Sequence, residues 1–189
     1  GFTNIRVYVS IDGIEEKCEY VRKNLSWESI EENIEHIKST TDVDLFVNTT
    51  VSIFNIMHLT ELHKYLVGKG FFDVDKITLN LLQFPEYYNI KILPLKMKEQ
   101  VIKKIKDHIQ WMYGHKVFQE YETDMHQQKQ IRQWETCITY MTDANWTHLI
   151  SKFIDITEKL DNIRDEVLLE VFPELEPLYT FKGRRQKYE

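Results

Sequence analysis

The sequence lacks the features that mark secreted and membrane proteins. It contains no signal peptide, no lipidation motif and no apolar run near the roughly 18 residues that a membrane-spanning helix needs. Its net charge is −6, and its only basic cluster, residues 182–187, lies at the extreme C-terminus, where it reads first as a solvated tail. An acidic chain without another basic run argues against non-specific nucleic-acid binding. We therefore expect no membrane and no nucleic-acid partner.

Motifs of several common catalytic classes are missing as well. The chain has no P-loop, GxGxxG, GxSxG or CxxC. It has two cysteines, Cys18 and Cys137, which lie far apart in sequence and form no metal-ligand pair. This cysteine usage is typical of a cytoplasmic protein with reduced thiols. Neither cysteine has a patterned base nearby, so neither is expected to be a catalytic nucleophile.

The composition that remains is that of an ordinary globular protein. Of the 189 residues, 42% are hydrophobic and 29% are charged, which predicts one domain, or one and a fraction, with a sizeable core. The chain begins at Gly1, directly on a predicted strand, rather than at Met. This start favours a piece of a longer protein, or a processed or truncated one.

Hydrophobic periodicity predicts an α/β fold over residues 1–112. Apolar residues alternate with polar ones over residues 5–12, as in a strand with one face toward a core, and Gly13 ends the strand. Further strands are predicted near 45–53 and 76–82, and helices near 15–22, 27–38, 56–67 and 95–112. Three successive strand–helix units imply a parallel sheet.

Each predicted strand carries polar side chains on one face. These residues are Ser10 and Asp12 on the first, Asn48, Thr50 and Ser52 on the second, and Thr78 and Asn80 on the third. Strands of a fully buried parallel sheet are usually apolar on both faces. The pattern is therefore compatible with a shared polar cavity, such as the inner wall of an open barrel. It is equally compatible with polar groups that hydrogen-bond inside a packed core.

Residues 113–189 have a different composition and predict a mostly helical extension. Residues 114–130 are polar and weakly patterned, as in a loop or an exposed helix start. Helices are predicted near 128–141, 144–160 and 161–170, the last one stopped by Phe172-Pro173. The predicted organisation is thus 1–112 for the strand–helix units and 113–189 for the extension.

The seven histidines and Arg22 have side chains able to bind a ligand. The seven histidines show no ligand-like spacing, and His58 and His63 are five residues apart and do not share a helix face, so no metal site is predicted. Arg22 follows the first strand by ten residues, close enough to fold back over its end. Its guanidinium is able to clamp a carboxylate with two hydrogen bonds, although a lone arginine is more often a surface residue.

Several segments resemble one enzyme family. They are Val9-Ser10-Ile11-Asp12-Gly13, Glu19-Tyr20-Val21-Arg22, Trp27-Glu28-Ser29-Ile30, Val47-Asn48-Thr49-Thr50-Val51-Ser52 with Asn55, Ile92-Leu93-Pro94 and Val171-Phe172-Pro173-Glu174-Leu175. Together they resemble the radical S-adenosylmethionine (SAM) enzymes, and within them the subgroup with SPASM or twitch-type C-terminal extensions. The likeness spans nearly the whole chain, and its best motif is short.

The resemblance implies a fold and a ligand. The family fold is a partial (β/α)6 TIM-like barrel, of which the three units here would be the second half. By resemblance, Ser10 on the fourth barrel strand and Arg22 just beyond it contact the amino-acid end of SAM, chiefly its carboxylate. Asn48 is a weaker candidate for the cofactor or substrate face, and Asp12 matches the motif but is compatible with a structural role, capping the turn at Gly13.

The chain departs from the family at the cluster motif. The CxxxCxxC that binds the [4Fe–4S] cluster, and the further cysteines of a full SPASM domain, are absent. An intact relative would use the cluster, with a reductant protein, to cleave SAM and abstract hydrogen from a substrate, here expected to be a peptide or protein; this chain alone would be inactive. The alternative is a non-catalytic α/β module, degenerate from such a barrel, that binds a peptide or protein.

Overall fold

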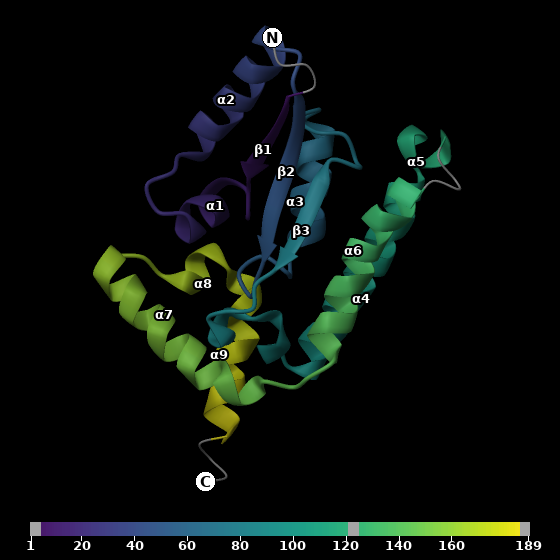
Figure 1. The fold of residues 1–189 in the computed structure, drawn as a ribbon. Helices are drawn as coiled ribbons and strands as arrows, with labels where there is room; N and C mark the ends of the chain where they lie inside the picture. The colour runs from purple at the N-terminus through teal and green to yellow at the C-terminus, as the bar shows by residue number, and fades with distance from the viewer. Residues whose placement is uncertain (1–4, 121–124, 186–189) are drawn as a thin grey trace.

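The computed structural model describes residues 5–120 and 125–185 and has the predicted α/β organisation in its first half (Figure 1). The elements there are β1 (Arg6–Ser10), α1 (Glu15–Val21), α2 (Trp27–Thr40), β2 (Asp44–Val51), α3 (Leu59–Gly68), β3 (Ile77–Leu81) and α4 (Leu95–Tyr113). Two short 3-10 turns, η1 (Glu86–Tyr88) and η2 (Ile90–Ile92), lie between β3 and α4. The helix predicted from residue 56 begins three residues later, at Leu59, because residues 54–58 form turns.

The three strands form one parallel sheet in the order β1-β2-β3. The register pairs Ser10 with Asn48 and Asn48 with Thr78, and one step further along it pairs Thr50 with Asn80. Residues paired in this way point to the same side of a sheet. The prediction that polar side chains of successive strands share one face is therefore confirmed for these five residues.

The opposite face of the sheet carries the core. Val47, Val51 and Ile77 are each 1% exposed and pack with apolar residues of α2 and α3. The sequence sets these helices locally: the Ser26 hydroxyl accepts the amide hydrogen of Ser29 at the start of α2, and Leu59, Leu62 and Leu66 recur on one face of α3. The helices therefore cover one side of the sheet.

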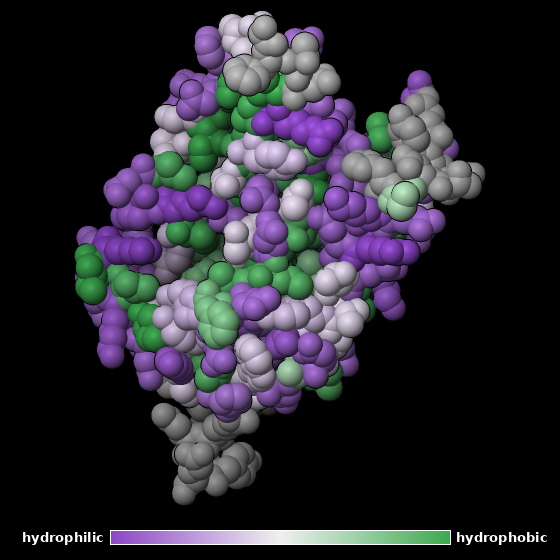
Figure 2. Space-filling model, viewed as in Figure 1, coloured by the Kyte–Doolittle hydropathy of each residue, from purple (hydrophilic) through white to green (hydrophobic). Residues whose placement is uncertain are grey.

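No described helix packs over the other face of the sheet, here called the open face (Figure 1). It is formed by Tyr8, Ser10, Phe46, Asn48, Thr50, Thr78 and Asn80, all of them exposed or half-buried. Figure 2, seen from the same side, shows purple and pale residues over the strands with green residues between them. Parallel sheets are normally covered on both faces. This sheet is covered on one.

The two edges of the sheet differ. Helix α6 (Met125–Thr142) lies along β3. Its Gln133 side chain forms two hydrogen bonds with the β3 backbone, as a neighbouring strand would. Oε1 accepts the Leu79 amide hydrogen at 2.8 Å, and Nε2 donates to the Ile77 carbonyl at 3.3 Å. At the other edge, Ile5 and Tyr8 are 48% and 54% exposed. The β3 edge is thus capped by the extension, whereas β1 presents exposed apolar side chains.

The second half of the chain is helical, as predicted, although its boundaries differ. It contains α5 (Lys116–Glu120), α6, η3 (Thr147–Leu149), α7 (Ile150–Arg164), α8 (Leu168–Val171), η4 (Pro173–Leu175) and α9 (Glu176–Arg185). The helix predicted at 161–170 is wrong: α7 continues to Arg164 and ends at Asp165, whose backbone is left-handed, and α8 is a separate turn. Part of the polar stretch 114–130, residues 121–124, lies outside the described residues.

Among the described helices, none has both the length and the apolar character that crossing a bilayer requires.

Candidate functional site

Asp12 and Arg22 form an ion pair just past the end of β1. Arg22 donates from Nε at 2.9 Å and from Nη2 at 2.8 Å, both to Oδ2 of Asp12. The Asp12 side chain is 8% exposed and that of Arg22 is 33% exposed. The prediction that Arg22 folds back over the strand end is therefore confirmed, and the carboxylate that it contacts in this structure belongs to the protein itself.

Asp12 also links β1 to β2. Its Oδ1 accepts the backbone amide hydrogen of Thr50 at 2.7 Å. The proposed capping of the turn at Gly13 is corrected here, because both carboxylate oxygens point to other partners. Gly13 leaves room for α1: a Cβ at this position would lie 3.1 Å from the backbone nitrogen of Cys18, a tight contact that would need a small shift.

Asn55 braces the same strand end from the loop after β2. Its Nδ2 donates to the carbonyls of Asp12 at 3.1 Å and Thr50 at 2.8 Å, and its Oδ1 accepts the Ser52 amide hydrogen at 2.9 Å. The side chain is 1% exposed. The sequence predicts no structural role for Asn55, which appears there only among the residues that resemble the family. The Ser52-to-Asn55 spacing of a turn was the available signal for its bracing role.

Ser10 and Asn48 lie beside each other on the open face, one on each of two paired strands. The Ser10 side chain is exposed, and Asn48 accepts a hydrogen bond through its Oδ1 from Nδ2 of Asn80. The four residues predicted as ligands therefore gather at one end of β1 and β2. Ser10 and Asn48 are on the face, and Asp12 and Arg22 are at its carboxyl end. Asn80 was predicted only to lie on the polar face, and in the structure its hydrogen bond orients the Asn48 side chain.

The C-terminal helices buttress the helix that leads to Arg22. Tyr20 of α1 donates from its hydroxyl to Oδ1 of Asp161 on α7 at 2.7 Å. Burial, followed by this hydrogen bond, raises the pKa of Tyr20 well above its ordinary value. Arg164 donates to the Tyr20 carbonyl at 3.4 Å. These contacts fix the last turn of α1, from which Arg22 extends.

A second buttress joins α1 to the segment before α9. Glu174 accepts a hydrogen bond from Lys17 and contacts Nδ1 of His58 at 3.2 Å. Burial by itself would raise the pKa of Glu174, but the hydrogen bonds from His58 and Lys17 outweigh it and lower that pKa to about 2. The carboxylate thus stays ionised and holds α1 near the loop between β2 and α3.

Thiol and metal chemistry find no support in this arrangement. Cys18 and Cys137 are buried and unpaired, and burial raises the pKa of both, that of Cys137 to about 12. Within residues 5–120 and 125–185, no three His, Cys, Asp or Glu side chains are grouped so as to hold a metal ion. The residues present do not fit an iron–sulfur cluster.

Two buried histidines contact each other, which no spacing in the sequence indicates. His63 on α3 and His108 on α4 contact through Nδ1 and Nε2 at 2.8 Å, beside the ring of Trp134. Burial lowers the pKa of His63 to about 3 and that of His108 to about 2. The pair is a neutral hydrogen bond within the core, on the face of the sheet opposite the Ser10 and Asn48 side chains.

The charged group at the end of β1 and β2 that the sequence predicts as an anion ligand, the Arg22 guanidinium, is paired in this structure with Asp12. This partly exposed guanidinium is oriented by a buried carboxylate just past the end of β1. The open face before it carries the exposed Ser10 and the half-buried Asn48. A guanidinium binds carboxylates through paired hydrogen bonds. Comparisons of the chain with models of known protein families, with curated proteins and with solved structures find no match.

Proposed function

We propose that this chain is the C-terminal part of a radical SAM enzyme, and that Ser10 and Arg22 hold the carboxylate of SAM. The observation that carries the proposal is the Asp12–Arg22 pair at the carboxyl end of a strand with an exposed polar face. In parallel α/β folds, ligands bind at the carboxyl ends of the strands. The residues that resemble the family's SAM motif are the residues that gather there.

The sheet supports the barrel half of the proposal. Its three parallel strands follow one another in chain order, with helices on one side only. This arrangement is compatible with a segment of a partial (β/α)6 barrel, whose inner face is lined by side chains or holds a ligand. In the intact protein, preceding strands would pair with the exposed edge of β1 and curve around the open face.

The Arg22 side chain fits a carboxylate ligand. Both of its hydrogen bonds to Asp12 come from the edge that carries Nε and Nη2. An arginine has five N–H donors in a planar fork, so the edge that carries Nη1 is free of this pair. Asp12 is then a positioning residue that fixes the plane of the guanidinium, and the exposed Ser10 hydroxyl supplies a further donor.

The cluster is the part that this chain does not supply. A [4Fe–4S] cluster, when bound, supplies the electron for SAM cleavage, and its three thiolates would come from sequence preceding Gly1. We therefore propose SAM binding without cleavage for this chain alone. The intact enzyme would act in the cytoplasm on a peptide or protein, with a reductant protein as partner.

Calorimetric titration of SAM and of decarboxylated SAM into the chain tests the binding site. We expect saturable binding of SAM, at least tenfold tighter than that of decarboxylated SAM, because only SAM has the carboxylate. Ser10→Ala should weaken SAM binding by about 0.5–1.5 kcal/mol, as for one hydrogen bond. Ser151→Ala, an exposed serine on α7, should change nothing. Equal affinities for the two ligands would refute the proposal.

The alternative, a non-catalytic binding module, has one observation in its favour. On the open face, Tyr8 stacks on Phe46 at a centroid distance of 5.1 Å, and Arg6 and Lys76 lie over the Phe46 ring at 5.8 and 4.6 Å. Aromatic residues and arginines are enriched in protein-binding surfaces, whereas lysines are depleted there, so Tyr8, Phe46 and Arg6 carry this argument. Absence of CxxxCxxC upstream in the native reading frame, together with failure to bind SAM, would favour this reading.

A further inference from the structure

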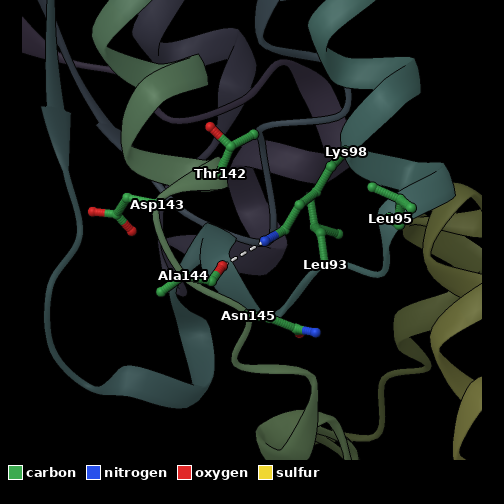
Figure 3. A pocket seen from close by; sticks show the side chains of 7 residues that line it. All are labelled: Leu93, Leu95, Lys98, Thr142, Asp143, Ala144 and Asn145. Carbon is green, nitrogen blue, oxygen red and sulfur yellow. Dashed lines mark hydrogen bonds between the residues drawn. The ribbon is translucent and has the colours of Figure 1, made fainter.

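A second candidate site lies at the start of α4, in a cavity of about 400 Å3. It is lined by Leu93, Leu95, Lys98, Thr142, Asp143, Ala144 and Asn145. These residues come from the first turn of α4, the residues just before it, and the segment that joins α6 to η3. Figure 3 shows the Lys98 side chain reaching across the cavity toward the Ala144 carbonyl.

Lys98 is a buried cation in this cavity. The residue is 6% exposed, and its Nζ donates to the Ala144 carbonyl oxygen at 2.8 Å. A lysine ammonium has three N–H donors, so this bond leaves two for a ligand. Burial lowers the pKa of Lys98, because removal from water disfavours its charged form. An anion in the cavity would reverse this effect.

The acidic residue in the cavity wall, Asp143, forms its ion pair with Lys91 and acts on Lys98 only through its charge, which favours the charged form of Lys98. Asp143 contacts Nζ of Lys91 at 2.8 Å, and Figure 3 shows its carboxylate turned away from Lys98. Lys91 in turn lies over the rings of Tyr140 and Trp146, at 4.0 and 5.0 Å. The Lys91–Asp143 pair is thus internally balanced, and the charge that remains at the cavity is that of Lys98.

The first turn of α4 adds to the attraction for an anion. A helix N-terminus carries a partial positive charge and is stabilised by acidic residues, yet this 19-residue helix has none in its first turn and begins Leu95-Lys96-Met97-Lys98. Two lysines at this end oppose the helix dipole. One of the two is the buried Lys98, so this turn holds a local conflict of charge, and such conflicts are typical of functional sites.

Apolar side chains determine what kind of anion fits. Leu93 is fully buried in the cavity wall, whereas Leu95 is 72% exposed. Leu95 also lines an adjoining hollow of about 460 Å3 formed with Pro94, Met97, Pro177 and Phe181. A ligand with a short apolar chain would cover Leu95 while its anionic end reaches Lys98.

We propose that this cavity binds a carboxylate carried on a short apolar chain, with Lys98 as its charged partner. Free short-chain acids and the C-terminal residue of an apolar peptide share this chemistry. The inference does not depend on SAM binding, because it involves none of the residues at the end of β1 and β2. Failure of either proposal leaves the other standing.

Calorimetric titration of the full chain with hexanoate, N-acetylleucine and uncharged hexanamide tests the proposal. We expect hexanoate or N-acetylleucine, or both, to bind saturably, and hexanamide at least tenfold more weakly. Tighter binding of N-acetylleucine would indicate a peptide C-terminus, and tighter binding of hexanoate a free acid. No saturable binding of either acid up to about 10 mM, or equal binding of hexanamide, would overturn the proposal.

Two substitutions of Lys98 assign the binding to this residue. Lys98→Gln and Lys98→Met should each weaken binding of the acids at least tenfold, and Lys106→Gln, an exposed lysine on the same helix, should not. Lys98→Met replaces a buried charge by an apolar chain of similar length, a change that proteins often tolerate, so it keeps the test valid if Lys98→Gln fails to fold. Unchanged affinity in Lys98→Met would refute the role of Lys98.

Discussion

Removing Arg22 should destabilise the fold through the carboxylate that it leaves behind. In Arg22→Ala, the Asp12 side chain, 8% exposed, would keep only the Thr50 amide as a partner. Breaking a fully buried ion pair costs about 3–5 kcal/mol. Arg22 itself is 33% exposed, so solvent already screens part of the interaction, and we expect a loss of about 2–3 kcal/mol.

The reciprocal change separates the pair from its surroundings. Asp12→Ala removes the acceptor of both Arg22 and the Thr50 amide, and should cost about 2–4 kcal/mol. Arg22→Ala in the Asp12→Ala background should lower the free energy of unfolding only slightly, because the guanidinium has already lost its Asp12 partner and is hydrated. The double-mutant cycle should therefore give a coupling energy of about 1.5–3 kcal/mol.

Urea unfolding followed by circular dichroism measures this cycle. A matched control is the exposed pair Lys103–Asp107 on α4, whose side chains are 80% and 65% exposed and whose coupling should be about 0.3–0.5 kcal/mol. A coupling at Asp12–Arg22 no larger than at the control pair would refute the reasoning. It would show that Arg22 is not held by Asp12 and would remove the positioning role from the proposed site.

Two further predictions concern buried polar groups. Asn55→Ala should cost about 2–4 kcal/mol in urea unfolding, because it strips partners from Asp12, Thr50 and Ser52, whereas Asn33→Ala on the exposed side of α2 should cost under about 0.5 kcal/mol. Burial depresses the pKa of His63 and His108 below the ordinary value of about 6.5. Below about pH 6.5, the unfolded chain therefore binds more protons at these two histidines than the folded chain does. Stability should then fall as the pH drops from about 6.5 toward 3, by up to about 1.4 kcal/mol per pH unit for each histidine, and the double variant His63→Phe/His108→Met should flatten this dependence between pH 7 and 5. An equally steep dependence in the double variant would contradict the assignment.

The strands were predictable because their two faces differ in chemistry. Alternation along residues 5–12 and 45–53 identifies the strands, and the order of strands and helices identifies a parallel sheet. The pattern does not distinguish a polar cavity wall from polar groups inside a packed core. The structure leaves that face exposed, which no local periodicity encodes, since coverage depends on distant segments.

The sequence predicted that Arg22 lies near the end of the first strand, but not which residues it contacts. Nothing in the spacing showed that Asp12 would be its partner. The bonds of Tyr20 to Asp161 and of His63 to His108 join residues 141 and 45 positions apart. Contacts at such separations are set by how the elements pack, so single-sequence patterns do not reveal them. The predicted helix boundary at residues 160 and 161 was wrong for a local reason: α7 continues to Arg164 and ends at Asp165, whose left-handed backbone the apolar pattern does not reveal.

The contacts between α1 and the C-terminal segments can form only late in synthesis of the chain. Tyr20 meets a partner 141 residues later, and Lys17 meets one 157 residues later. A nascent chain emerges from its N-terminus, and its earlier parts fold first. The strands and their helices are therefore made long before Glu174 exists, and Arg22 is carried until then on a helix without its buttress. A ribosome that stalls or terminates before residue 174 would release a sheet beside which Arg22 lacks this support.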